Sequence, residues 1–384
     1  MRPPLSGLGR LGLMSLALLL VWGGGEVAAQ TSIYGIRGLG YPGRSANARG
    51  RGLGSGFTVL DLGSPVNPAA VAGFGTITVE IMAETNLRSY TIDTVQVTGL
   101  SSTRFPLAQL GGRIATTPLS FALSFSQYTD RSYDLTTADS LQLRGQTVTY
   151  EERTTSRGGI ADLRGALGYR LGSRLWLGAG VHVLTGSAKL TFSRLFADTA
   201  YRPYQIETEE SISGFGVSAG AIFLPSDRFA FGLAVRSDTR AKVEVDSAEA
   251  ANVDLPFTVT GGARVSLGRP LRWGTTVTWR SWSMADDDLD ARAFDTWEIG
   301  TGLEFGGAET GTSRFPVRVG FRYATLPFSA TDEQPHELTA ALGIGLAFAG
   351  GRGLIDAAIE RAMRSGAGAE ESAWQLSWTV TVRP

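Results

Sequence analysis

Residues 216–220, Gly-Val-Ser-Ala-Gly, have the spacing of the nucleophile motif of serine hydrolases, with Ser218 at the centre. In that motif a strand, a sharp turn and a helix raise the serine hydroxyl above a sheet, where a histidine can take its proton. Here small and apolar residues keep alternating through Ala221 and Phe223. This pattern predicts an uninterrupted strand with Ser218 on its small-residue face, and it argues against an esterase.

A metal site has little more support in the sequence than an esterase site. The chain has two histidines, His182 and His336, and no cysteine, whereas a zinc site needs three or four ligands. No sequence feature points to a histidine-dependent triad. Carboxylates that could bind a divalent cation occur in one stretch, formed by Asp286, Asp287, Asp288 and Asp290. The spacing of an EF-hand is absent from this stretch, which favours a solvated loop.

A dinucleotide cofactor is also disfavoured. Three glycines superficially resemble a phosphate-binding loop, namely Gly52, Gly54 and Gly56. Such a loop works between a strand and a helix of a βαβ unit, and no such pattern surrounds them. We therefore predict no catalytic residue, no metal site and no cofactor.

The overall composition excludes further classes. The chain has 384 residues, a formal net charge of -1 and 50 glycines, and its only lysines are Lys189 and Lys242. A near-neutral charge gives no reason to expect a nucleic-acid partner. Without cysteine, disulfides and thiolate chemistry are excluded. The glycines recur inside apolar segments, which is unusual for a soluble core.

The N-terminus carries an export signal. Arg2 and Arg10 come before an apolar run from Leu11 to Trp22, and Val-Ala-Ala at 27–29 supplies a small-residue cleavage site. A membrane anchor is the alternative, but spanning a bilayer takes about 20 apolar residues. We predict a cleaved signal peptide over residues 1–29. The exported chain is then periplasmic, secreted or a β-barrel in the outer membrane.

Strict alternation of apolar and polar residues favours the barrel. In the last segment one face holds Trp374, Leu376, Trp378, Val380 and Val382, and the other holds Gln375, Ser377, Thr379, Thr381 and Arg383. The same pattern recurs at 229–236, 297–305, 317–323 and 338–348. A soluble sandwich also alternates. Here, however, the second face is rich in glycine and alanine, and aromatic residues near segment ends resemble an interfacial girdle.

A sheet that spans lipid must close on itself, which requires an even number of strands. Candidate strands lie at 74–90, 105–116, 119–135, 146–170, 175–195, 204–224, 229–246, 254–267, 272–284, 294–306, 314–329, 336–349, 353–365 and 372–383. Tight turns are expected at 117–118, 171–174, 225–228, 268–270 and 350–352. Longer outer loops are expected at 136–145, 196–203, 247–253, 285–293, 330–335 and 366–371. The longest strands, 146–170 and 175–195, should project beyond the outer surface.

The stretch before the first strand does not alternate. It contains Gly35, Gly38, Gly40, Gly43, Gly50, Gly52, Gly54 and Gly56, and these are followed by Asn67-Pro68-Ala69. This arrangement resembles the FadL-like outer-membrane transport family, which transports long-chain fatty acids and other hydrophobic compounds. That family has a glycine-rich start and an Asn-Pro-Ala motif before its first strand. Weaker similarity lies at 322–323, 326–328 and 336–339, whereas Ser-Pro-Val at 64–66 stands where relatives often carry tyrosines.

The resemblance implies a fold and a division of the chain. The fold class is all-β, a closed antiparallel transmembrane β-barrel of about fourteen strands. The divisions are a cleaved signal peptide at 1–29, a plug or hatch at 30–73, and the barrel at 74–384. A flexible linker is the alternative for 30–73, but its apolar residues favour a plug, with Asn67, Pro68 and Ala69 as hatch or gating residues. In the family, ligand leaves through the barrel wall, and we place a kink for such an exit near Gly111-Gly112 or Thr117-Pro118.

Alternation also predicts which charges face the lumen. These are Glu80, Glu84, Asp162, Arg164, Arg236, Arg264, Glu298, Glu304, Arg318, Arg322, Asp356 and Glu360. An ion-selective pore is normally lined by one sign of charge, whereas both signs occur here. The mixture suggests ion pairs that hold a plug.

The sequence therefore favours a channel in the outer membrane of a Gram-negative bacterium for passive uptake of hydrophobic molecules such as fatty acids or hydrocarbons. Its expected contacts are outer-membrane lipids, lipopolysaccharide and a hydrophobic ligand, and we expect a monomer. A non-transport barrel that serves as a scaffold or secretion partner is the second hypothesis. An outer-membrane hydrolase acting through Ser218 is the third.

Overall fold

The computed structural model describes residues 32–383, except positions 93, 144, 199, 247, 269 and 290 and the stretch 307–314. The predicted signal peptide, residues 1–29, lies outside the described residues. No helix within the described ranges is long and apolar enough to cross a membrane.

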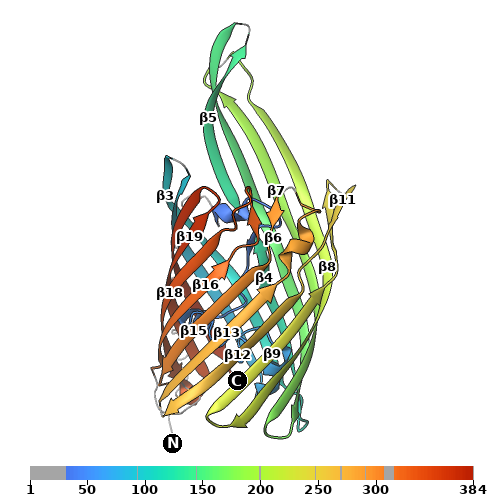
Figure 1. Ribbon diagram of the computed structural model, residues 1–384, viewed down its shortest axis with the longest axis vertical. Coiled ribbons are helices and arrows are strands. Elements are labelled where there is room, and N and C mark those ends of the chain that lie inside the picture. Colours follow the sequence, from blue (N-terminus) through green and yellow to red (C-terminus); the bar gives the residue numbers. More distant parts are fainter. Residues whose placement is uncertain are drawn as a thin grey trace, which may run out of the picture.

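Fourteen antiparallel strands form a closed barrel (Figure 1). They are β2 (Thr78–Ile92), β3 (Val95–Arg113), β4 (Leu119–Asp130), β6 (Gln146–Leu171), β7 (Leu175–Phe196), β8 (Tyr204–Ser226), β9 (Phe229–Asp238), β12 (Thr258–Gly268), β13 (Leu271–Arg280), β15 (Thr296–Phe305), β16 (Val317–Thr325), β18 (His336–Phe348), β19 (Gly353–Gly366) and β20 (Ala369–Val382). The last strand closes on the first, from Val382 opposite Val79 to Ala369 opposite Ile92. The predicted fold class and strand number are confirmed.

The outward face of the wall is apolar. In β20, Trp374 and Trp378 are 49% and 47% exposed, whereas Ser377 and Thr379 between and beyond them are fully buried. The same alternation runs around the barrel, so a continuous band of large apolar side chains faces outward. Such a band would be unfavourable in water and is stable in lipid. The barrel is therefore built to span a membrane.

Two segments predicted as outer loops, 136–145 and 247–253, consist largely of strands, so these two predictions are wrong. Residues 136–143 belong to β5 (Tyr133–Leu143), which pairs along the upper part of β6. Residues 247–253 lie largely in a hairpin of β10 (Ala241–Val245) and β11 (Ala248–Val253). The middle of β5, from Thr136 to Ser140, and the small and polar residues of β11 show no sustained apolar alternation, whereas β10 does alternate, with Ala241 and Val243 buried. The predicted loop at 366–371 is instead a tight turn between β19 and β20.

The two ends of the barrel differ as the sequence predicted. Strands β6, β7 and β8 continue with β5 far beyond the rest of the wall at one end (Figure 1). At the other end, short turns join β3 to β4, β6 to β7 and β8 to β9, and the last strand ends there (Figure 1). Long extensions mark the outer side of such barrels and short turns mark the periplasmic side.

An arginine placed on the outward face should show which part of the wall lies in lipid. Val181 is 51% exposed near the middle of the barrel part of β7, and Leu195 is 58% exposed in its outer extension. We expect Val181→Arg to lower the free energy of unfolding by about 2–4 kcal/mol, the cost of arginine at a bilayer midplane. Leu195→Arg should change it little. Equal losses in urea unfolding from liposomes would contradict this placement of the membrane.

The wall is irregular between β3 and β4. The two strands pair only from Arg113 opposite Ser120 to Leu107 opposite Ser126. Above that point the register of β3 against β2 shifts across Phe105-Pro106, where proline has no N–H to give to a ladder. The predicted kink at Gly111-Gly112 is wrong, because both glycines pair regularly with β4, and Thr117-Pro118 lies in the turn.

Candidate functional site

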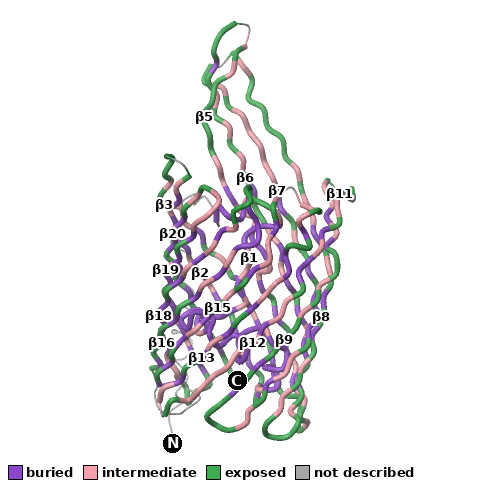
Figure 2. The backbone as a smooth tube through the Cα atoms, in the orientation of Figure 1, coloured by how far each residue is buried: buried purple, intermediate pink, exposed green. Residues whose placement is uncertain are grey.

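The chain from Ser32 to Ile77, called here the N-terminal segment, lies inside the barrel. Its elements are the 3₁₀ helix η1 (Ile33–Gly35), strand β1 (Tyr41–Pro42), helix α2 (Ala48–Gly52) and the 3₁₀ helix η2 (Pro68–Gly73). Helix α2 contacts β16, β18, β19 and β20, whereas η2 contacts β6, β7 and β8 on the opposite wall. Figure 2 shows these buried turns within the ring of strands. The segment thus crosses the lumen from wall to wall.

Glycines let the backbone of the segment touch the backbone of the wall. A methyl group added to Gly320 of β16 would overlap the backbone of Gly54, and one added to Gly178 of β7 would overlap Pro68. A Cβ at Gly56 would lie 2.7 Å from the nitrogen of Gly302. Only residues without a side chain permit such an approach. This contact explains why the lumen face is so rich in glycine.

The Asn67-Pro68-Ala69 sequence fixes the lower end of the segment. Asn67 caps η2, since its Oδ1 accepts from the Ala69 nitrogen at 2.9 Å. Its Nδ2 donates to the carbonyl of Val59 at 2.8 Å and to that of Ala221 in β8 at 3.4 Å. Proline suits the first position of a helix because its missing N–H has no partner there. Asn67 therefore joins two parts of the segment to the wall.

Three arginines of the segment form ion pairs with buried carboxylates of the wall. Arg44 Nη1 lies 2.8 Å from Glu360 Oε1, and Arg51 Nη2 lies 2.9 Å from Glu84 Oε2. Arg49 Nη2 lies 2.9 Å from Glu304 Oε2. Burial, together with neighbouring Arg44, lowers the pKa of Arg51, and Glu84 and Glu360 oppose that effect. A charge buried this deeply is stable only beside its partners.

Further ion pairs connect the strands themselves. Arg318 pairs with Asp356 at 2.6 Å, and Arg322 pairs with Glu298 at 2.8 Å. Arg104 is notable because it bridges three strands, with Glu84 of β2 at 2.7 Å and Asp130 of β4 at 2.8 Å. It therefore spans the place where β3 and β4 no longer pair.

The structure places the predicted lumen charges inside the barrel. Those that are buried are Glu80, Glu84, Asp162, Arg164, Glu304, Arg318, Arg322, Asp356 and Glu360. Arg236 and Arg264 are partly exposed and line the lumen cavities. Glu298 is partly exposed and pairs with Arg322. Sequence reasoning missed Arg44, Arg49 and Arg51, because the segment has no periodicity. It also missed Glu337 and Arg364. Alternation could have found both, because Glu337 lies on the same face of β18 as Thr339, and Arg364 lies on the same face of β19 as Glu360.

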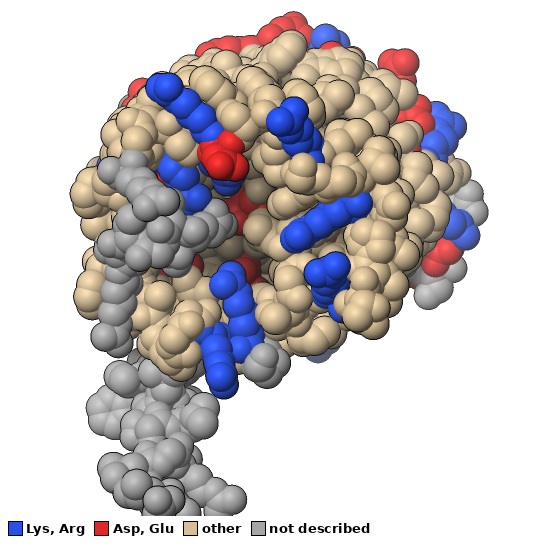
Figure 3. All heavy atoms as spheres, turned by 90° about the horizontal axis from the view of Figure 1, so that it is seen from below, with Lys and Arg blue, Asp and Glu red and all other residues tan. Residues whose placement is uncertain are grey.

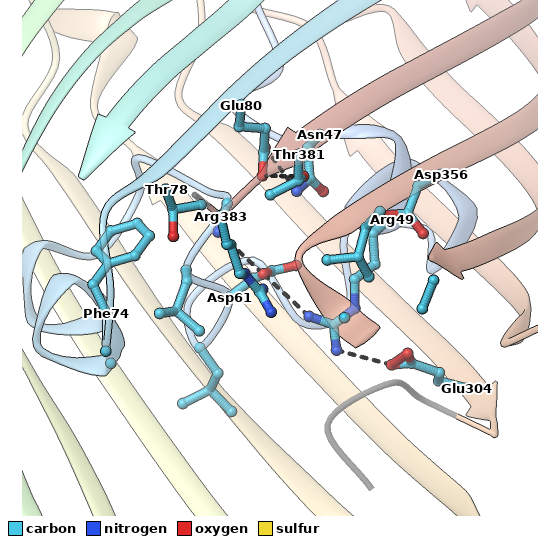
Figure 4. A pocket seen from close by; sticks show the side chains of 18 of the residues that line it. Asn47, Arg49, Asp61, Phe74, Thr78, Glu80, Glu304, Asp356, Thr381 and Arg383 are labelled. Carbon is cyan, nitrogen blue, oxygen red and sulfur yellow. Dashed lines mark hydrogen bonds and ion pairs between the residues drawn. The ribbon is translucent and has the colours of Figure 1, made fainter. Parts of the chain in front are cut away.

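The described residues line a larger and a smaller cavity in the lumen. The larger, about 950 Å³, lies at the periplasmic end, and Figure 3 shows the hollow with basic side chains around it. Its lining mixes apolar residues, among them Trp176, Ile222 and Leu224, with charged residues such as Arg272 and Glu304. Figure 4 shows Arg49 reaching between Asp61 and Glu304 at its edge. The smaller cavity, about 90 Å³, lies beside Tyr128 and shares no lining residue with the first.

Ser218 and His182 lie together in the barrel wall, whereas His336 has a different partner. Ser218 lies within β8, so the predicted uninterrupted strand is confirmed. The barrel nevertheless brings Ser218 beside His182 and Asp162, which sequence reasoning did not anticipate because it requires the register of three strands. His336 lies at an outer strand end, 3.2 Å from the Ser365 hydroxyl.

The acidic stretch is engaged with its own surroundings. Asp286 accepts from the Ala293 nitrogen at 2.7 Å, and Asp288 accepts from the Asp254 nitrogen at 2.8 Å. Asp290 lies outside the described residues. Within the described ranges, no group of three or more candidate metal ligands comes together.

Comparisons with known proteins identify the architecture. No protein-family model and no curated protein sequence matches the chain. Among solved structures, a Pseudomonas aeruginosa FadL homologue has a TM-score of 0.64 at 16% identity, covering 89% of this chain and 99% of its own. The Ralstonia pickettii toluene transporter TbuX has a TM-score of 0.60 at 14% identity, covering 88% and 98%. The monoaromatic hydrocarbon channel CymD has a TM-score of 0.58 at 12% identity, covering 91% and 99%. These neighbours are transporters and channels rather than enzymes, and the chain has the fold of the FadL-like outer-membrane channels.

Proposed function

We propose that this protein is an outer-membrane channel of a Gram-negative bacterium for the passive uptake of hydrophobic small molecules, with residues 30–73 acting as its hatch. The observation that carries the proposal is a lipid-facing barrel whose lumen is occupied by its own N-terminal segment. The segment contacts opposite walls and is held by buried ion pairs. A permanently open pore would not need a segment that occupies its lumen.

The charges inside the barrel argue against an ion or general solute pore. Many of the lumen arginines and carboxylates neutralise one another in pairs, so the lumen is not lined by a single sign of charge. The two cavities share no lining residue, and the segment lies between them. Passage therefore requires movement of the segment or an exit through the wall.

The interruption between β3 and β4 supports an exit through the wall. Above Ser126, strand β4 pairs with β1 of the segment, with Asp130 opposite Tyr41 and Thr129 opposite Pro42. The segment thus completes the wall where β3 has turned away. Withdrawal of β1 would leave an unpaired strand edge open toward the lipid, which suits a solute that prefers lipid to water.

The solved neighbours support the class of solute. Two of them are described as a toluene transporter and a monoaromatic hydrocarbon channel. The apolar patch of the periplasmic cavity would accept the same chemistry. Each barrel holds a complete lumen, so we propose that it works as a monomer. Its outer band and extension would contact membrane lipids and lipopolysaccharide.

Uptake by intact cells tests the proposed function. A strain that lacks the gene should take up radiolabelled toluene, an alkane or a long-chain fatty acid more slowly than its parent. Expression from a plasmid should restore the rate, while uptake of a labelled polar sugar stays the same in all strains. If none of these hydrophobic solutes distinguishes the strains, the proposal is wrong, and a scaffold role would be tested by co-purification.

A further inference from the structure

We propose that Asp162, His182 and Ser218 form a serine-nucleophile site in the lumen wall that hydrolyses small carboxylic esters. This inference goes beyond the proposed channel function and does not depend on it. It rests on the geometry of three side chains that come from three consecutive barrel strands, β6, β7 and β8.

The three side chains have the order and spacing of a catalytic triad. His182 Nε2 lies 2.9 Å from Ser218 Oγ. On the other side of the ring, His182 Nδ1 lies 2.9 and 3.0 Å from the two carboxylate oxygens of Asp162. All three residues are buried. The carboxylate can hold the imidazole in the tautomer that leaves Nε2 free to accept the serine proton.

Strand register, rather than a nucleophile elbow, assembles the site. Leu184 stands opposite Asp162, and Gly180 stands opposite Ser218, so the three side chains lie on a diagonal across the lumen face. Gly180 is essential to this arrangement, because a Cβ there would lie 2.7 Å from Ser218 Oγ. The absent side chain leaves the hydroxyl free to point at the histidine.

Arg236 supplies a donor beside the serine. It is directly opposite Ser218 in the pairing of β8 with β9. Its Nη1 binds Asp162 at 2.5 Å and its Nε binds Asp238 at 2.9 Å, whereas its buried Nη2 has no hydrogen-bond partner among the described residues. An unpartnered guanidinium donor at this place can bind the oxygen that becomes negative during acyl transfer.

The reaction would follow from these positions. Ser218 Oγ attacks the ester carbonyl as His182 Nε2 takes the hydroxyl proton, and Arg236 stabilises the oxyanion. The bond to the alcohol oxygen then breaks, and His182 returns the proton to the departing alcohol. Water attacks the acyl-serine with His182 again as base, which releases a carboxylic acid and restores Ser218. Asp162 acts as a positioning residue.

The small cavity adjoins the site on the side of Asp162, His182 and Arg236, although Ser218 itself is not among its lining residues. This cavity of about 90 Å³ is lined by Asp162, His182 and Arg236 on the wall side and by Pro65 and Val66 of the segment on the other. Its size restricts reagents to small ones while the segment is seated. Displacement of residues 65–66 would enlarge it.

Labelling by phenylmethylsulfonyl fluoride, followed by intact-mass and peptide analysis, tests the proposal on the full-length protein in detergent. We expect a single adduct on Ser218, which Ser218→Ala removes. His182→Ala should slow labelling at least about 100-fold, the usual contribution of a general base. Asp162→Asn should slow it similarly while Asp162→Glu recovers part of the rate, a rescue that a merely structural role would not produce. Ser124→Ala is the matched control, since Ser124 is as buried as Ser218 but its hydroxyl has no hydrogen-bond partner among the described residues.

Turnover and a loosened variant complete the test. Wild-type protein should hydrolyse p-nitrophenyl acetate above the rate of Ser218→Ala. Labelling should be faster in Glu84→Gln, whose N-terminal segment we expect to be less firmly seated. If Ser218 carries no adduct in either the wild type or Glu84→Gln, the three side chains form a structural network and the proposal is wrong.

Discussion

Replacing Glu84 with glutamine is expected to lower the free energy of unfolding by about 3–5 kcal/mol and to unseat the N-terminal segment. Glu84 is fully buried, and its two oxygens lie 2.9 Å from Arg51 of α2 and 2.7 Å from Arg104 of β3. Removing one partner of a buried ion pair leaves the other charge uncompensated, which has a cost of that size. Arg104 keeps its close pair with Asp130, whereas the remaining carboxylate beside Arg51 among the described residues is Glu360 at 3.7 Å. The segment should therefore be affected more than the wall.

Urea unfolding and single-channel conductance would measure the two effects. The variant should unfold at lower urea and show frequent conducting events in planar bilayers, where the wild type is mostly closed. Glu207→Gln is the control, because the Glu207–Lys189 pair lies on the exposed extension and such pairs contribute about 0–1 kcal/mol. Equal effects of the two substitutions would show that the buried pair does not hold the segment.

Fixing the segment to the wall should have the opposite effect and stop transport. A Cβ built at Gly52 of α2 lies 3.6 Å from the Cβ of Ala358 in β19, within the range of disulfides. The same Cβ would lie 2.8 Å from the Cα of Gly343, so α2 must shift slightly to accept it. The chain has no cysteine of its own, which leaves Gly52→Cys/Ala358→Cys with one possible intramolecular bond.

Uptake of a labelled hydrophobic solute should fall at least about tenfold when this pair is oxidised and recover when it is reduced. Each single-cysteine variant, treated with the same oxidant, controls for the substitutions and for the oxidant. Unchanged uptake through the fully oxidised protein would mean that α2 stays in place during transport. The part of the hatch that moves during transport would then be limited to β1 and the wall beside it.

Much of the barrel could be predicted because lipid imposes a simple rule on each strand. The alternation from Trp374 to Val382 identifies β20 and its outward face, and similar patterns identify most of the wall. The rule fails where lipid is absent. Strands β5 and β11 lie outside the membrane and lack a sustained apolar face, so the pattern does not mark them as strands.

The candidate site could be predicted only in part. Alternation points Glu84, Glu304 and Glu360 inward, but it does not reveal their partners, because those lie in a segment without periodicity. The approach of Gly54 to Gly320 likewise depends on how the segment folds in three dimensions. The meeting of Asp162, His182 and Ser218 depends on strand register, which a single sequence does not specify.

Uptake into liposomes whose outer leaflet is lipopolysaccharide, with the purified protein as their only protein, tests the central claim most directly. An absorbent matrix inside the vesicles retains the labelled toluene that enters. Vesicles with wild-type protein should take up toluene several times faster than protein-free vesicles or vesicles with oxidised Gly52→Cys/Ala358→Cys. A labelled sugar of similar mass should enter all three at one slow rate. Filling with toluene at the protein-free rate, or equal acceleration of sugar and toluene, would contradict a hatch-gated channel for hydrophobic molecules.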